Sequence, residues 1–97
     1  MPRYVVERTH EDRLSITGGI EGAEACLAIV ERNADEGVTW LQSYVSDDGR
    51  KTFCVYDAPS PEAIRKTAVR NELPVDRITR VSVLDPYFYT RDDRRSL

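Results

Sequence analysis

Three side chains in this 97-residue chain belong to types that can hold a metal or move a proton: Cys54, His10 and Glu7. A cysteine thiolate binds late transition metals and acts as a nucleophile. Imidazole binds metals through nitrogen and titrates near neutral pH. Glu7 places a carboxylate in a segment expected to be a central strand, where a charge requires a partner or a ligand. These three are the candidate metal-binding residues.

Each candidate also has a purely structural interpretation. Most free cysteines pack as small apolar residues, and a lone histidine in a charged loop is usually solvated. Glu7 would instead form an ion pair with one of three arginines, namely Arg3, Arg8 or Arg80. The chain has no zinc motif, no second histidine and no phosphate-binding glycine loop. We therefore assign no catalytic residue from the sequence.

The segment 38–56 contains two alternating runs around Asp47-Asp48-Gly49, which predicts a β-hairpin with Gly49 in the left-handed region. If Ser46 pairs with Arg50, Gln42 lies directly opposite Cys54. One face of the hairpin is then predicted to be core, formed by Leu41, Val45, Phe53 and Val55. The other face would hold Trp40, Gln42, Tyr44, Thr52, Cys54 and Tyr56.

That second face is aromatic around a glutamine–cysteine pair, and it is too apolar to lie bare in water. It is expected to be a ligand site or a subunit interface, with Trp40, Gln42, Tyr44 and Tyr56 as its contact residues. Aromatic rings stack on planar ligands, but they are equally typical of protein–protein interfaces. Both possibilities remain open on the sequence.

The rest of the chain supplies two strands and two helices around this hairpin. Residues 2–8 and 78–84 are expected to be strands. Residues 20–36 are expected to form a helix that ends at Gly37, with its buried stripe formed by Ala23, Leu27, Val30 and Ala34.

A second helix is expected to start at Ser60, the N-cap, with Pro61 in the first helical position. Pro74 ends it. Its buried side is predicted to consist of Ala63, Ile64, Thr67, Ala68 and Leu73.

The resulting order is strand, helix, strand, strand, helix, strand. With right-handed crossovers this is an α+β protein, the ferredoxin-like βαββαβ sandwich, with a four-stranded antiparallel sheet and two helices on one face. The uncovered face of the sheet predicts a homodimer that pairs sheet to sheet. We expect one domain over residues 1–86 and an aromatic, then charged, C-terminal tail over residues 87–97. The aromatic part of the tail is expected to pack across a subunit edge and the charged part, from Arg91, to be frayed.

Charge and hydropathy exclude some partners. The chain has 17 acidic and 14 basic residues and a formal net charge of -3. This balance argues against nucleic acid and against anionic membranes, both of which call for a basic face. No segment has the apolar run of a signal peptide or a membrane span. A cytoplasmic location with reduced cysteines is expected.

The run WLQSYVSDDGRKTFCVYDAPSPEAIRKTAVRNELPVDRI, together with the opening PRYVVERT, resembles a family of small bacterial ferredoxin-like domains. Its best-described branch consists of nickel-binding proteins. The resemblance extends from Pro2 to about Pro86 and implies a dimer and a metal held partly by histidine. In the nickel-binding branch the position of Gln42 is commonly histidine, beside the cysteine that matches Cys54, and this chain has glutamine there.

These observations support three functions. The first is a small non-catalytic, dimeric binding protein that holds nickel or another transition metal through Cys54. The second is a small cofactor-free enzyme of the oxygenase or isomerase type, with acid–base candidates Glu7, His10, Tyr44 and Tyr56. The third is a structural interaction module whose aromatic face is used up by the dimer.

Overall fold

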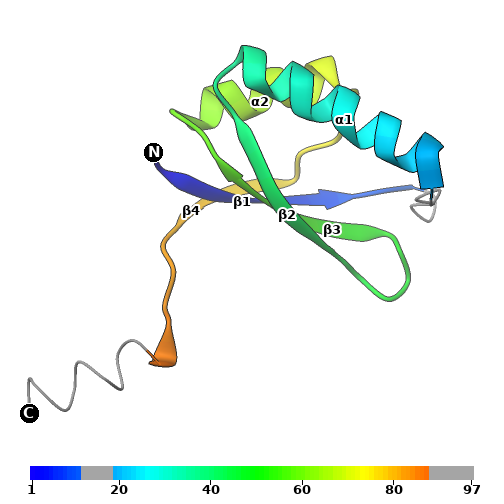
Figure 1. Ribbon diagram of the computed structural model, residues 1–97. Coiled ribbons are helices and arrows are strands. Elements are labelled where there is room, and N and C mark those ends of the chain that lie inside the picture. The colour runs from blue at the N-terminus through cyan, green and yellow to red at the C-terminus, as the bar shows by residue number, and fades with distance from the viewer. Residues whose placement is uncertain (12–18, 88–97) are drawn as a thin grey trace, which may run out of the picture.

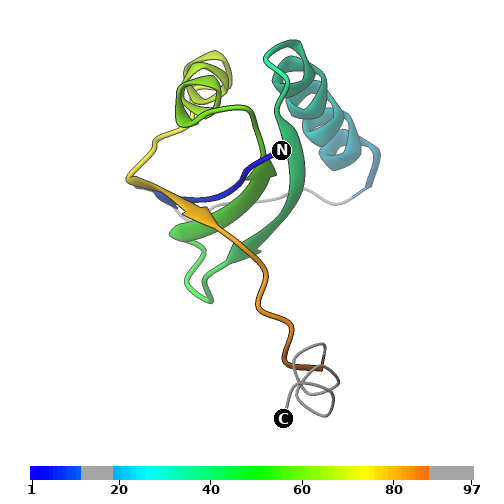
Figure 2. The same cartoon turned by 90° about the vertical axis from the view of Figure 1, so that its left-hand side faces the viewer.

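The computed structural model describes residues 1–11 and 19–87. The elements follow the order β1, α1, β2, β3, α2, β4, with bounds Arg3–Thr9, Gly19–Asp35, Thr39–Val45, Lys51–Asp57, Pro61–Arg70 and Arg77–Val81. The sheet is antiparallel throughout, with strand order β2-β3-β1-β4. Both helices cover one face of it (Figures 1 and 2). This confirms the predicted ferredoxin-like sandwich.

The local signals in the sequence position the ends of these elements correctly. The Ser60 side chain caps α2 by accepting a hydrogen bond from the Ala63 amide at 3.2 Å, and Pro61 begins the helix. Gly37 and Gly49 both have φ of 71°, the left-handed region that glycine enters without steric cost. The C-terminal part of the predicted tail, residues 88–97, lies outside the described residues.

The register of the hairpin differs from the prediction by one residue. The Ser46 amide donates to the Lys51 carbonyl at 2.9 Å, so the loop has four residues and not three. A register shift between Trp40 and Gln42 then changes the pairing again. Ser43, and not Gln42, lies opposite Cys54.

The face predicted to be open is the one that the helices cover. The core contains Tyr4, Val6, Cys54, Tyr56 and Ile64. From the predicted core face, Phe53 and Val55 are half-buried on the other side. Val45 pairs instead with Thr52 and so belongs to the helix-covered side, where it is exposed, and Leu41 lies exposed at the register shift. The prediction was wrong because both faces of β3 carry apolar side chains, so alternation shows which residues share a face but not which face meets the helices.

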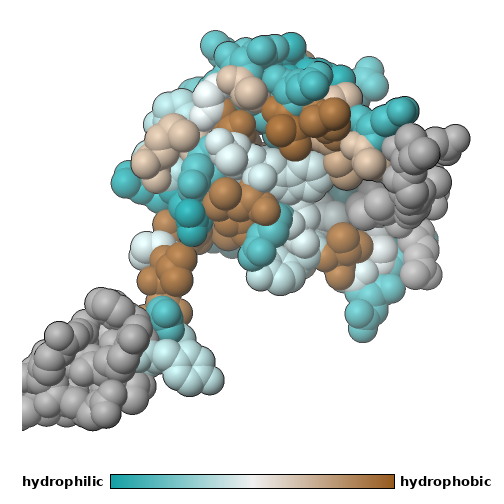
Figure 3. All heavy atoms as spheres, in the orientation of Figure 1, coloured by the Kyte–Doolittle hydropathy of each residue, from teal (hydrophilic) through white to brown (hydrophobic). Residues whose placement is uncertain are grey.

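Helix α2 buries four of the five predicted residues, Ala63, Ile64, Thr67 and Ala68. The fifth, Leu73, lies beyond the end of α2 and is half-buried. Helix α1 does not bury its predicted side. Leu27, from its predicted stripe, is 57% exposed, whereas Cys26 and Ile29 are half-buried and Asn33 is fully buried. Figure 3 shows hydrophobic side chains at the surface over α1 and along the segment after β4.

Polar contacts decide how α1 is turned. The Asn33 side-chain oxygen accepts a hydrogen bond from the Asn71 amide at 3.0 Å, just beyond the end of α2. Arg70 of α2 donates to the Asp35 carboxylate at 3.0 Å and to the Arg32 carbonyl at 3.1 Å. These bonds join the C-terminal ends of the two helices and turn Asn33 inward, leaving Leu27 outside.

The assignment of the covered face predicts unequal costs for two valine truncations. Val6→Ala removes two methyl groups at a site of 0% exposure and should lower the free energy of unfolding by about 2 kcal/mol. Val69→Ala, at 78% exposure on α2, should change it by less than about 0.5 kcal/mol. Urea denaturation of both variants measures this, and equal costs would contradict the assignment.

Candidate functional site

A line of polar and aromatic side chains runs along the helix-covered face of the two central strands. We call it the helix-facing row and define it as Arg8, His10, Thr52, Cys54 and Tyr56. Arg8 of β1 lies opposite Thr52 of β3, and the row alternates with residues that point to the open face. All of its members are buried except His10, which is half-buried at the outer end.

Arg8 is the most unusual member of the row because its charge is buried. The side chain is 2% exposed. Its Nη2 donates to the Tyr56 hydroxyl at 3.3 Å, and its Nη1 donates to the Pro74 carbonyl at 3.4 Å. The guanidinium also lies 5.9 Å from the centre of the Tyr56 ring, within cation–π range. Its Nε is buried and has no hydrogen-bond partner within residues 1–11 and 19–87.

The environment of Tyr56 keeps its hydroxyl protonated. Burial raises the pKa of Tyr56 from about 10 to about 12, although the nearby Arg8 charge acts in the opposite direction and Cys54 raises it further. A protonated phenol can donate one hydrogen bond while it accepts the one from Arg8. At the end of the row away from His10, the charged Arg8 guanidinium therefore lies beside the neutral Tyr56 hydroxyl.

His10 and Cys54 lie on the same side of the sheet, and Glu7 does not. The His10 Nε2 is 3.1 Å from the Thr52 hydroxyl oxygen. Thr52 and Cys54 are two residues apart on β3 and share the helix-covered face. Glu7 points to the opposite face, where its carboxylate lies 3.9 Å from the Lys51 Nζ. This ion pair differs from the three arginine partners that the sequence suggested.

The predicted contact residues of the aromatic face are divided between the two sides. Trp40 packs against the core, and its indole N–H donates to the Ser43 hydroxyl at 2.8 Å. Gln42 and Tyr44 are exposed on β2, and the Gln42 amide donates to the Tyr44 hydroxyl at 2.7 Å. The predicted pair of Gln42 with Cys54 therefore does not form within one subunit.

The same division affects the acid–base residues of the enzyme hypothesis. Glu7 and Tyr44 flank Phe53 on the open face, whereas His10 and Tyr56 belong to the helix-facing row. No single constellation contains all four. Within residues 1–11 and 19–87, no three side chains of histidine, cysteine, aspartate or glutamate are grouped closely enough to hold a metal ion.

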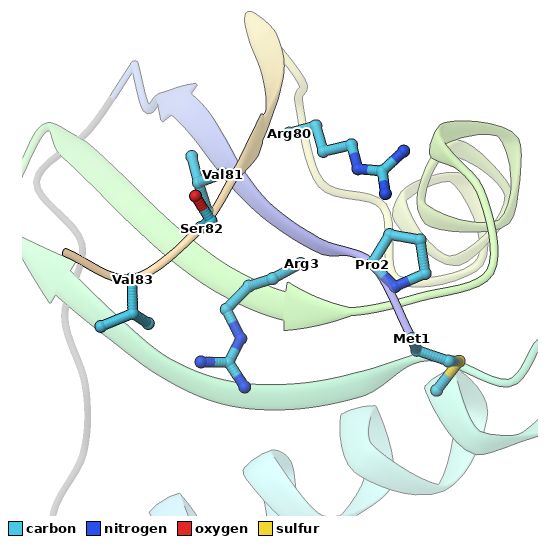
Figure 4. Close-up of a pocket in the computed structure, with 7 residues that line it drawn as sticks. All are labelled: Met1, Pro2, Arg3, Arg80, Val81, Ser82 and Val83. Carbon is cyan, nitrogen blue, oxygen red and sulfur yellow. The ribbon is translucent and has the colours of Figure 1, made fainter.

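A surface depression of about 320 Å³ lies elsewhere, beside the start of β1 and the end of β4. It is lined by residues 1–3 and 80–83 (Figure 4). Its Arg3 is already held by the Asp57 carboxylate at 2.8 Å. None of the candidate residues from the sequence contributes to it.

Sequence reasoning placed Thr52 on this face but missed Arg8 as a member of the site. The signal was present in β1, where Tyr4, Val6 and Arg8 occur at every second position. An arginine in phase with two core residues is a charge at a core position, and such a residue requires a partner. Glu7, the charge next to it, is out of phase with these core residues and points to the other face.

The strand order, the two helices on one face and the buried row between them define a ferredoxin-like α+β domain. The family model of the nickel responsive SCO4226-like proteins matches residues 4–81, so the chain belongs to this family. The crystal structure of SCO4226 from Streptomyces coelicolor A3(2) is similar, with a TM-score of 0.68 and 18% identity. The alignment covers 86% of this chain and 99% of that one.

At this identity the likeness to SCO4226 supports the fold alone. A search of curated proteins gives no match. Among the described residues, no helix is long and apolar enough to cross a membrane. The family match confirms the resemblance inferred from the hairpin and the start of α2.

The raised pKa of Tyr56 predicts a loss of stability at high pH. The unfolded chain releases this proton near pH 10 and the folded chain near pH 12, so the free energy of unfolding should fall by about 3 kcal/mol between these values. Urea denaturation of the wild-type protein and of Tyr56→Phe at several pH values from 9 to 12 measures the fall. Tyr56→Phe lacks the hydroxyl and should not show this contribution. Equal pH dependence in both proteins would contradict the burial of this hydroxyl.

Proposed function

We propose that the chain is a small, non-catalytic binding protein that holds nickel or another late transition metal, with Cys54 as the thiolate ligand and His10 as the nitrogen ligand. What supports the proposal is the position of both residues on the helix-covered side of the sheet, on either side of Thr52. Thiolate and imidazole together suit late transition metals. The description of the family as nickel responsive points to the same class of ligand.

Two features of the row limit the strength with which it can bind a metal. Two side chains do not complete the coordination shell of nickel, so further ligands must come from water, from a second copy or from outside the described residues. Glu7 is excluded because it lies on the opposite face with Lys51. The buried Arg8 charge repels a metal cation, and we therefore expect weaker binding than in a site built of several histidines.

Nickel binding by the untagged protein tests the proposal, with the two cysteines serving as a matched pair. Cys54→Ser removes the thiolate ligand and should weaken nickel binding roughly tenfold or more. Cys26→Ser makes the same replacement at the half-buried cysteine of α1, which is not one of the proposed ligands, and should leave binding unchanged. Native mass spectrometry and thiolate-to-metal charge-transfer absorption measure both effects.

Absence of nickel binding to the wild-type protein would contradict the proposal, as would binding that survives Cys54→Ser.

Both cysteines are free in the structure. A reducing compartment such as the cytoplasm would keep them available as ligands, and we place the protein there.

We further propose that the protein pairs with a second copy through the open face of the sheet. Half-buried Val5, Phe53 and Val55 form the centre of this face, and Tyr44 extends from it at 60% exposure. An apolar sheet face with no helix over it is stabilised by covering it with another such face. Trp40 does not belong to this surface because it packs against the core.

Tyr44→Asp probes this dimer because the side chain is exposed in the single subunit, so we expect the change to cost the fold little. A charge introduced into an apolar interface should shift the protein to monomer. Val69→Asp places the same charge on the exposed side of α2 and should leave the dimer intact. Analytical ultracentrifugation distinguishes the two, and a wild-type monomer or a dimer that tolerates Tyr44→Asp would refute the sheet-face interface.

A further inference from the structure

The buried charge of Arg8 has no counter-charge among the described residues. The ion pairs in this part of the chain join Arg3 with Asp57, Lys51 with Glu7, and Arg70 with Asp35 and Glu36. None of them involves Arg8. Its two hydrogen bonds, to the Tyr56 hydroxyl and the Pro74 carbonyl, are long at 3.3 and 3.4 Å and go to neutral acceptors.

An arginine stays charged in a protein interior, and an uncompensated buried charge is costly. A buried guanidinium normally has its N–H groups bonded to a carboxylate, a phosphate or several carbonyls. The Nε–H belongs to the edge of the guanidinium that donates two hydrogen bonds to a carboxylate. In Arg8 it has no partner in the part of the chain that the structure describes. The site has one positive charge and one buried guanidinium nitrogen without a hydrogen bond among the described residues, on the helix-covered side of the sheet.

The neighbours of Arg8 in the row are neutral hydrogen-bonding groups. Tyr56 and Thr52 carry hydroxyls, Cys54 carries a thiol, and His10 lies at the half-buried outer end. A single positive charge balances a single negative one, whereas a doubly charged phosphate would leave one charge uncompensated in the same low-dielectric layer. Charge and donor geometry both favour a carboxylate.

We propose that the helix-facing row binds a small monocarboxylate, whose carboxylate group accepts the free Nε–H of Arg8. The apolar part of the ligand would lie against the Tyr56 ring, in the layer between sheet and helices. Entry is from the His10 end, where the row is half-buried, and requires a local opening of that end. This site stands independently of the proposed metal, since it uses the guanidinium and not the thiolate.

The test uses the side-chain Nε–H signals of arginine in the ¹⁵N-labelled wild-type protein, titrated with sodium acetate against sodium chloride of equal ionic strength. The Arg8 signal, assigned by its loss in Arg8→Lys, should move saturably with acetate. The signal of Arg65, exposed on α2, should not move. Acetate should also raise the Tm of the wild-type protein, and this rise should disappear in Arg8→Lys.

A wild-type titration in which acetate leaves the Arg8 signal unmoved would overturn the proposal. So would a signal that responds to sodium phosphate and not to acetate, because it would assign a different anion. If Arg8→Lys fails to fold, Tyr56→Phe serves instead. This variant keeps the guanidinium and removes the hydroxyl beside it, and its acetate affinity should fall several-fold while the Arg8 signal still responds.

Discussion

The buried guanidinium of Arg8 constrains the arrangement of the whole domain. It joins three parts of the chain, because it extends from β1 to the Tyr56 hydroxyl of β3 and to the Pro74 carbonyl after α2. Next to it the Asp76 amide donates to the Glu7 carbonyl at 2.8 Å, which holds the same loop against β1. Displacing any of these segments would leave a buried charge with even fewer partners, at a cost of several kcal/mol.

Features of the fold that are set by neighbouring residues could be predicted from the sequence, whereas features set by packing between distant segments could not. Local chemistry was sufficient for the Ser60 cap and for the left-handed glycines, because each acts within a few residues. The covered face of the sheet could not be predicted in this way. Cys54 and Tyr56 on one face and Phe53 and Val55 on the other are both apolar, so only long-range packing distinguishes them.

The residues of the site also divide into those that local chemistry identifies and those whose position depends on long-range pairing. Cys54 and His10 were identified by their chemistry, and both belong to the helix-facing row. Gln42 is separated from Cys54 by the register of β2 and β3, through a four-residue loop and a nearby bulge. Glu7 lies on the other face because side chains alternate along β1. A chain of the nickel responsive family thus combines a thiol, an imidazole and an unpaired buried cation in one layer. The thiol and imidazole favour a metal, whereas the guanidinium favours an anion.

The central claim is that this row lies beneath the helices, and the rate of thiol labelling at Cys54 tests it most directly. In a Cys26→Ser background Cys54 is the single thiol. Its sulfur is buried in the structure, so a thiol reagent should react many times more slowly with the native protein than with the urea-unfolded chain. Equally fast labelling in both states would place Cys54 on the open face and contradict the account.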